Sequence, residues 1–223
     1  MNSKNRTLII VVAAIVLIAG LAGLALLLSG GDESSGGVVA PSSTNENGDI
    51  IGPPPLENTQ PVEVSGTPLP PYDSQSADPA IGTAAPIVAG QSFDGDPVVL
   101  GGATGQPSML VFLAHWCPHC NNEIPELIAL EDAFGIPVGV DVIGISTGVQ
   151  EGQANYPPSE WIDDRGWPWP VLADDAESTA FLAYGGSGFP YTVLLDADGN
   201  VLSRVSGSRS GSDISAWLNQ FVG

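Results

Sequence analysis

Apolar and polar residues follow a different pattern in each successive part of this chain. Residues 1–7 are polar, residues 8–28 are uncharged and almost wholly apolar, and residues 29–78 are rich in Gly, Ser, Pro, Asn and acidic residues. From residue 79 onward, short apolar runs alternate with segments whose apolar residues recur at helical spacing. The pattern predicts a folded α/β domain over residues 79–223, preceded by a membrane anchor and a linker.

The apolar run at residues 8–28 is long enough to cross the roughly 30 Å hydrocarbon core of a bilayer as one helix. Lys4 and Arg6 precede it, and Asp32 and Glu33 follow it. By the positive-inside rule, the short N-terminal tail stays cytoplasmic and the remainder is exported. A cleaved signal peptide usually has an apolar region of only about 7–15 residues. We therefore expect a single-pass protein of the cell membrane with an extracytoplasmic domain.

Residues 29–78 lack the periodicity of a helix or a strand. Gly52-Pro53-Pro54-Pro55 and Pro68-Leu69-Pro70-Pro71 interrupt them. Because this composition buries little apolar surface, it predicts a disordered linker. The linker could serve as a leash that lets the domain reach partners near the membrane, or simply as a spacer.

The region from residue 79 onward predicts a mixed sheet with helices on both faces. Asp94-Gly95 and Asp198-Gly199 each lie between two strand-like runs and predict hairpins. Residues 109–114 are apolar throughout, as in a strand that is buried on both faces. The predicted strands are residues 85–88, 97–100, 109–114, 138–146, 169–172, 191–196 and 201–205, and the predicted helices are residues 118–134, 158–164, 177–184 and 213–221.

Charge and cysteine content narrow the possible functions. The chain has 25 acidic and 5 basic residues and a net charge of -20, so its surface repels phosphate backbones and nucleic-acid binding is not expected. Its two cysteines, Cys117 and Cys120, can form neither a multi-disulfide framework nor a four-cysteine zinc site. A lone C-x-x-C pair indicates redox chemistry.

The two thiols have different predicted environments. Cys117 falls where the apolar strand meets the helix, and Pro118 takes the first helical position. The free N–H groups of the first turn and the helix dipole favour a thiolate, so Cys117 is the predicted attacking thiol. Cys120 lies one turn later on the same face, within reach of a Cys117–Cys120 disulfide, and is the predicted resolving thiol.

Two neighbouring side chains are candidates for assisting the thiols. His119 would stabilise the thiolate when protonated, and Glu123, one further turn along, could exchange a proton with Cys120. Both could instead be ordinary surface residues. A static structural disulfide and a metal site of His115, Cys117, His119 and Cys120 are alternatives, although a helix cannot aim all four side chains at one point. We predict no metal or other cofactor.

The run Phe112 to Cys120, with Glu123 and Pro125 behind it, resembles the active-site strand and helix of the thioredoxin superfamily. It is most similar to membrane-anchored TlpA/ResA-type proteins and their redoxin relatives. Three further motifs fit that family. Asp94-Gly95 resembles the hairpin of its N-terminal extension, residues 188–192 resemble its cis-proline loop, and residues 193–201 resemble its closing hairpin. The resemblance covers residues 79–223 and implies a thioredoxin-like fold.

The resemblance also implies roles for further residues. Pro190 would be the cis-proline facing the disulfide, the backbone at Phe189 would pair with an extended substrate, and Trp116 would shape partner access. Pro125 would kink the active-site helix. Val111 stands where thioredoxins carry a buried acid, which leaves Glu123 as the proton relay. The implied partners are exported thiol or disulfide proteins, including apocytochrome c as a candidate, and a membrane redox partner.

The direction of exchange stays open at this point. Pro118-His119 resembles the oxidising DsbA group, whereas the architecture resembles reducing TlpA/ResA-type proteins. A peroxide-reducing redoxin is an alternative, but peroxiredoxins carry a threonine two or three residues before the reactive cysteine, where this chain has Ala114 and His115. A copper or other metal-binding chaperone is a further alternative.

Overall fold

The structure, a computed structural model, describes residues 58–134, 136–137 and 139–222. The predicted tail at 1–7, the membrane anchor at 8–28 and most of the predicted linker lie outside the described residues. Among the residues that are described, no helix combines the length and the apolar character that a bilayer span requires.

The described residues form strands and helices in the alternating order expected of an α/β domain. The strands are β1 (Glu63–Ser65), β2 (Ile87–Gln91), β3 (Pro97–Leu100), β4 (Ser108–Leu113), β5 (Asp141–Ser146), β6 (Val171–Ala173), β7 (Tyr191–Leu195) and β8 (Val201–Ser206). The helices are α2 (Pro118–Phe134), α3 (Pro158–Asp164), α4 (Thr179–Ala183) and α5 (Gly211–Val222).

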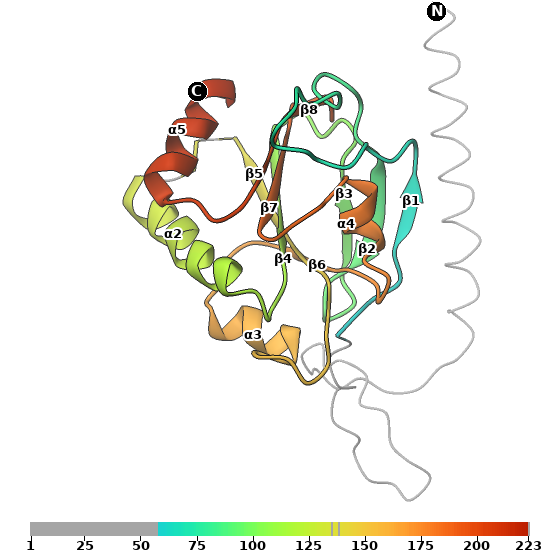
Figure 1. The fold of residues 1–223 in the computed structure, drawn as a ribbon, viewed down its shortest axis with the longest axis vertical. Coiled ribbons are helices and arrows are strands. Elements are labelled where there is room, and N and C mark those ends of the chain that lie inside the picture. The colour runs from blue at the N-terminus through green and yellow to red at the C-terminus, as the bar shows by residue number, and fades with distance from the viewer. Residues whose placement is uncertain (1–57, 135, 138, 223) are drawn as a thin grey trace, which may run out of the picture. The chain divides into compact units, whose positions relative to one another are not determined.

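The strands form one mixed sheet in the order β1-β2-β6-β5-β4-β7-β8, and β3 pairs with β2 beside this path (Figure 1). Strands β4, β5 and β6 run parallel, whereas β7 is antiparallel to β4 and β8 is antiparallel to β7. The central strand β4 is paired on both sides and buried along its whole length. It ends directly before Cys117, so the sheet fixes the position at which the active-site helix starts.

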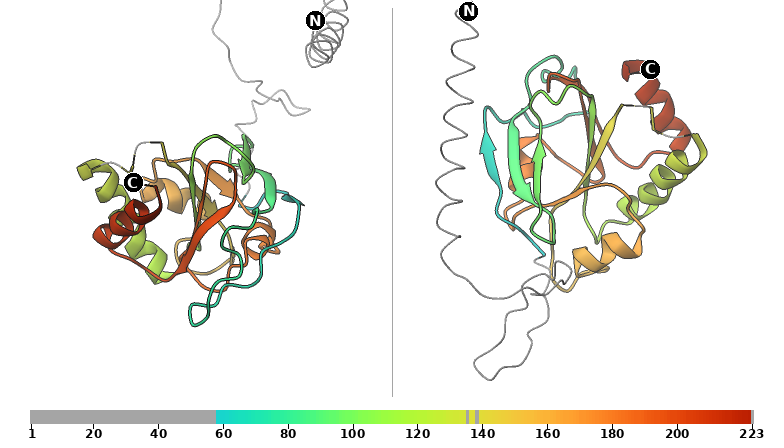
Figure 2. Two further views of the ribbon diagram at one scale, coloured as in Figure 1. Left: turned by 90° about the horizontal axis from the view of Figure 1, so that it is seen from above. Right: turned by 180° about the vertical axis from the view of Figure 1, so that it is seen from behind.

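Alternate residues of β4 face two separate cores, as the pleat of a strand requires. Met109, Val111 and Leu113 pack with residues of α2, α3 and α5. Leu110 and Phe112 pack on the other side with residues of α4. Figures 1 and 2 show α2 and α5 together on one face of the sheet and α4 on the other. The prediction of a mixed sheet with helices on both faces is confirmed.

Every predicted strand and helix has a counterpart among the described residues, and several are shorter than the pattern indicated. The helices predicted at 118–134 and 158–164 coincide with α2 and α3. Helix α4 begins at Thr179 and not at the predicted residue 177, because Ser178 has a left-handed φ of 61°. The carboxylates of Asp175 and Asp174 accept the N–H groups of Thr179 and Ala180 at 2.8 and 2.9 Å and so cap the helix at this point.

Residues 58–78 belong to the folded part of the chain, so the predicted boundary of the linker at residue 78 is wrong. Strand β1 pairs antiparallel with β2, and Leu69 is buried. The backbone N–H of Leu69 donates to Ala183 O at 2.8 Å, and that of Tyr72 donates to Gly185 O at 2.8 Å.

The buried side chain of Arg204 holds this N-terminal segment against the sheet. Arg204 of β8 forms an ion pair with Asp78, and its Nη1 donates to Pro70 O at 2.8 Å. Many of the contacts that hold the segment therefore use backbone carbonyls, which leave no trace in the apolar pattern. This explains how a proline-rich, polar sequence that predicts a linker is nevertheless part of the folded domain.

Candidate active site

Cys117 lies at the junction of β4 and α2. Its N–H donates to Ala114 O at 3.0 Å, and its carbonyl accepts the N–H of Asn121 at 3.2 Å, which closes the first turn of the helix. The sulfur therefore lies at a helix N-terminus, where first-turn N–H groups have no backbone acceptor within the helix. Cys117 and Cys120 are both free thiols in the structure.

Cys120 lies deeper than Cys117, being fully buried where Cys117 keeps 5% of its surface exposed. The N–H of Ala114 lies 3.5 Å from Cys120 Sγ. Burial raises the pKa of the Cys120 thiol, and the neighbouring Cys117 and Glu123 raise it further. Cys120 therefore needs a base before it can attack, which fits the resolving role and leaves Cys117 as the more accessible attacking thiol.

The loop before β7 brings two predicted substrate-binding residues to Cys117. The Phe189–Pro190 peptide bond is cis, and the Phe189 carbonyl oxygen lies 3.8 Å from Cys117 Sγ. The Phe189 ring stacks on Phe181 at a centroid distance of 4.6 Å and meets Trp116 edge-to-face at 5.8 Å. The fold thus places Trp116, Phe189 and Pro190 around the accessible thiol.

Glu123 is buried, with 3% of its surface exposed, and is not the solvated first-turn carboxylate that the sequence also allowed. Its Oε2 accepts the backbone N–H of Arg209 at 2.8 Å. Burial raises the pKa of Glu123 to about 7, although the hydrogen bond and the charge of Arg209 lower it. A carboxyl group that titrates near neutral pH next to a buried thiol can exchange protons with it.

His119 is exposed on the first turn of α2, between the two cysteines. It therefore faces solvent, whereas Cys120 and Glu123 are buried. Within the described ranges, no group of three or more His, Cys, Asp and Glu side chains could hold a metal ion. The four-residue metal site considered from the sequence is not formed, because both ring nitrogens of His115 contact the backbone of a loop at Gln150 and Ala154.

Two residues that the sequence interpretation missed support the site. Arg209 holds Glu123 through its backbone, which no sequence motif signals. Asn121 donates to Cys117 O at 2.9 Å and accepts the Nε1–H of Trp161 at 3.0 Å, linking α2 to α3. An asparagine in the first turn of a helix could have suggested a backbone contact, but its partner on α3 follows only from the fold.

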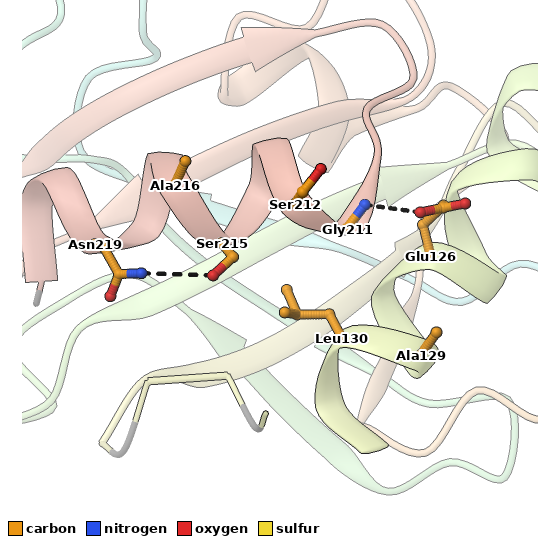
Figure 3. Close-up of a pocket in the computed structure, with 8 residues that line it drawn as sticks. All are labelled: Glu126, Ala129, Leu130, Gly211, Ser212, Ser215, Ala216 and Asn219. Carbon is orange, nitrogen blue, oxygen red and sulfur yellow. Dashed lines mark hydrogen bonds between the residues drawn. The ribbon is translucent and has the colours of Figure 1, made fainter. Parts of the chain in front are cut away.

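A groove of about 550 Å³ also lies between α2 and α5 (Figure 3). Glu126 crosses one end of it, where its Oε2 accepts the N–H of Gly211 at 2.8 Å. The residues that line the groove are Glu126, Ala129, Leu130, Gly211, Ser212, Ser215, Ala216 and Asn219. Because neither cysteine is among them, the groove is separate from the dithiol.

Comparison with known proteins agrees with this geometry. Residues 81–204 match the model of the AhpC/TSA family. The chain belongs to the AhpC/TSA family. This segment runs from the N-terminal extension to β8 and contains both cysteines, Glu123, Phe189 and Pro190.

Curated relatives carry names that refer to thiol chemistry or to methylamine utilization. The methylamine utilization protein MauD of Methylophilus methylotrophus is 33% identical over 131 residues, which is 56% of this chain and 56% of the relative. The thiol:disulfide interchange protein DsbE of Pseudomonas aeruginosa is 29% identical over 103 residues, 46% of this chain and 52% of the relative. The chain thus spans about half the length of these relatives.

Solved structures show the fold. A thioredoxin-family thiol:disulfide interchange protein from Chlorobium tepidum is 30% identical with a TM-score of 0.52, and the match covers 66% of this chain and 100% of that one. The thioredoxin domain of a thiol-disulfide oxidoreductase from Bacteroides vulgatus is 25% identical with a TM-score of 0.52, covering 65% and 99%. The chain has a thioredoxin-like α/β fold, and the predicted resemblance to the thioredoxin superfamily and its redoxin relatives is confirmed.

Proposed function

We propose that this protein is a thiol–disulfide oxidoreductase that exchanges disulfides with exported proteins through Cys117 and Cys120. The observation that carries the proposal is the position of Cys117 Sγ, 3.8 Å from the Phe189 carbonyl, with Cys120 buried behind it. An extended substrate that pairs with the backbone at Phe189 would bring its own sulfur to Cys117. Relatives named thiol:disulfide interchange proteins support the same chemistry.

The first step is a thiolate attack. The Cys117 thiolate bonds to one sulfur of a substrate disulfide, the substrate S–S bond breaks, and the second substrate sulfur leaves as a thiolate that takes a proton from solvent. The product is a mixed disulfide between Cys117 and the substrate. The helix N-terminus at Cys117 favours the attacking thiolate.

The second step resolves the mixed disulfide. Glu123 in its carboxylate form takes the proton of Cys120, and the Cys120 thiolate attacks Cys117 Sγ. The bond to the substrate breaks, and the released substrate thiolate takes a proton. The substrate disulfide gains two electrons and becomes a dithiol, while Cys117 and Cys120 form a disulfide. The reverse sequence oxidises a substrate dithiol.

The reduction potential of the Cys117–Cys120 couple decides the direction. A value near that of DsbA, about -120 mV, means a disulfide donor, and one near that of thioredoxin, about -270 mV, means a reductase. The Pro118-His119 dipeptide, which resembles that of the oxidising DsbA group, favours the first outcome, whereas the TlpA/ResA-like architecture favours the second. The reduction potential of the Cys117–Cys120 couple can be measured by equilibrating the full-length protein with glutathione and dithiothreitol redox buffers.

The location of the protein belongs to the same proposal. The apolar residues 8–28, with Lys4 and Arg6 before them, support a single-pass anchor with a cytoplasmic N-terminus and an extracytoplasmic catalytic domain. The partners would then be exported thiol or disulfide proteins, with apocytochrome c as a candidate client, and a membrane redox protein that regenerates the dithiol. Protease digestion of intact and permeabilised cells tests this, since the domain should be cleaved from outside.

The peroxide-reducing alternative is disfavoured by the residues before Cys117. Ala114 has no hydroxyl, and both ring nitrogens of His115 are engaged by the loop at Gln150 and Ala154. Neither side chain can therefore donate to a peroxide at Cys117.

Two cysteine variants test the proposed function as a matched pair. Cys117→Ala should abolish insulin reduction or oxidation of a reduced protein, because it removes the attacking thiol. Cys120→Ala should still attack and should accumulate the mixed disulfide, which mass spectrometry detects. Full activity in the Cys117→Ala variant would rule the function out.

A further inference from the structure

A loop between β5 and α3, residues 148–156, is fastened to the two residues that precede Cys117. We call it the flanking loop. Residues 150–156 are exposed, so the loop buries little apolar surface of its own. A segment of this kind is ordered mainly by the polar contacts at its base.

His115 makes most of these contacts. It is completely buried, its Nδ1 lies 2.8 Å from Ala154 O, and its Nε2 lies 3.1 Å from the backbone N of Gln150. Because the Gln150 N–H donates to Nε2, the ring proton must be on Nδ1, where it donates to Ala154 O. The His115 carbonyl accepts the side-chain amide of Asn155 at 2.7 Å. One residue thus holds three positions of the loop.

The start of the flanking loop supports the aromatic wall beside the thiol. Trp116 Nε1–H donates to Gly148 O at 2.8 Å. Gly148 has a φ of 61°, and a Cβ there would lie 3.2 Å from the Phe189 ring. Gly148 therefore bonds to Trp116 and leaves no room for a side chain beside the Phe189 ring, and the two aromatic rings meet edge-to-face across the site. If the loop moved, Trp116 would lose the contact that orients its indole.

We propose that His115 is a positioning residue that fastens the flanking loop and, through Gly148, sets the orientation of Trp116 for binding protein substrates. The inference rests on the proposed function and extends it. His115 does not touch the substrate, and its ring takes no part in electron transfer. Its effect lies in the affinity for a polypeptide substrate, which spans the Trp116 side of the site. A small disulfide needs only Cys117.

Three substitutions of His115 distinguish the contribution of the Nδ1 contact from that of the Nε2 contact. His115→Leu fills a similar volume and removes both, so the Gln150 N–H and the Ala154 carbonyl turn to water and the loop keeps only the Asn155 contact to the backbone carbonyl of residue 115. His115→Asn retains a donor near the place of Nδ1, and His115→Gln retains an acceptor near the place of Nε2. In the full-length protein, His115→Leu should raise KM for a protein disulfide about tenfold with kcat unchanged, which corresponds to about 1.4 kcal/mol. His115→Asn and His115→Gln should give smaller increases.

Two further readouts distinguish positioning from general damage. The rate with a small aromatic disulfide should stay within about twofold of the wild-type rate in all three variants, since it needs no loop contact. Hydrogen exchange at the Gln150 amide should accelerate in His115→Leu, while the amides of β4 keep their protection. His119→Gln, at the only other histidine in the chain, is the control and should leave Gln150 exchange unchanged.

Equal losses with protein and small disulfides, or an unchanged exchange rate at Gln150, would overturn the inference. If β4 also loses protection in His115→Leu, the Asn and Gln variants decide, because each keeps one ring contact. If the wild-type protein exchanges no disulfides at all, the proposed function fails. The hydrogen-exchange comparison still decides in that case whether His115 fastens the loop.

Discussion

The carboxylate of Glu123 accepts a hydrogen bond of 2.8 Å from the backbone N–H of Arg209, 86 residues further along the chain. The bond joins the active-site helix α2 to the segment before α5. It fixes an acid in a buried position where its charge acts on the Cys120 thiol. Because burial raises the pKa of Glu123 to about 7, the acid changes its charge within the physiological pH range.

Replacing Glu123 by Gln should slow the resolution step and spare the attack step. The amide cannot take the Cys120 proton, so the mixed disulfide should resolve about 100-fold more slowly, the low end of what a general base contributes. In the wild type the resolution rate should rise with pH through a midpoint near 7, and this midpoint should be absent in Glu123→Gln. Rapid acid quenching and mass spectrometry measure the step. Alkylation of Cys117 should proceed at the wild-type rate and serves as the control.

Glu123 should also make folding stability depend on pH. Its pKa is raised in the folded state from an ordinary value of 4.5 to about 7, so the folded protein holds this proton more tightly than the unfolded chain. The contribution is complete below about pH 4.5 and is lost as the pH rises to about 7, an effect on the order of 3 kcal/mol. Urea denaturation of wild type and Glu123→Gln at several pH values measures it. If the unfolding free energies of the two proteins instead show the same dependence on pH, Glu123 does not titrate in this range and the prediction is wrong.

Arg209 should tune the ionisation of Glu123 through its charge. The guanidinium is held by Asp213 O at 2.8 Å and lies over the Trp217 ring at 5.0 Å. Arg209→Ala removes the charge but keeps the backbone N–H, so the pKa of Glu123 should rise, whereas Arg209→Lys should leave it nearly unchanged. Carbon NMR of labelled glutamate carboxyl groups follows the titration. The matched control is Arg165→Ala, at an exposed arginine on the surface.

Arg204 should be essential for the attachment of residues 58–78. Its side chain is buried and pairs with Asp78 while donating to Pro70 O. Arg204→Met leaves the Asp78 carboxylate without its ion-pair partner and should cost about 3–5 kcal/mol of unfolding free energy. Denaturant unfolding measures the loss, and exchange at the Leu69 amide should accelerate. Arg165→Met should change neither quantity, and a stability equal to the wild type in Arg204→Met would contradict this account.

The order of apolar, turn and cysteine residues in the sequence was sufficient to predict most of the strands and helices and the position of the two thiols. Helices α2 and α3 have the predicted bounds, and both Asp-Gly turns connect paired strands, β2 with β3 and β7 with β8. These features are local: periodicity reports which face of a segment is buried, and turn residues report backbone conformation. The same local logic placed Cys117 at a helix start with Cys120 one turn behind it.

Only the tertiary structure decided which polar groups meet. Arg209 and Glu123 lie 86 residues apart, and Arg204 and Asp78 lie 126 apart. His115, which the sequence presented as a metal-ligand candidate, is a buried link to the flanking loop. Each of these contacts except the Arg204–Asp78 pair uses a backbone N–H or carbonyl, which nearly every residue carries, so no residue type marks its partner in advance. The sequence alone therefore determined where the thiols stand, and the fold determined which groups hold Glu123, Trp116 and the N-terminal segment in place.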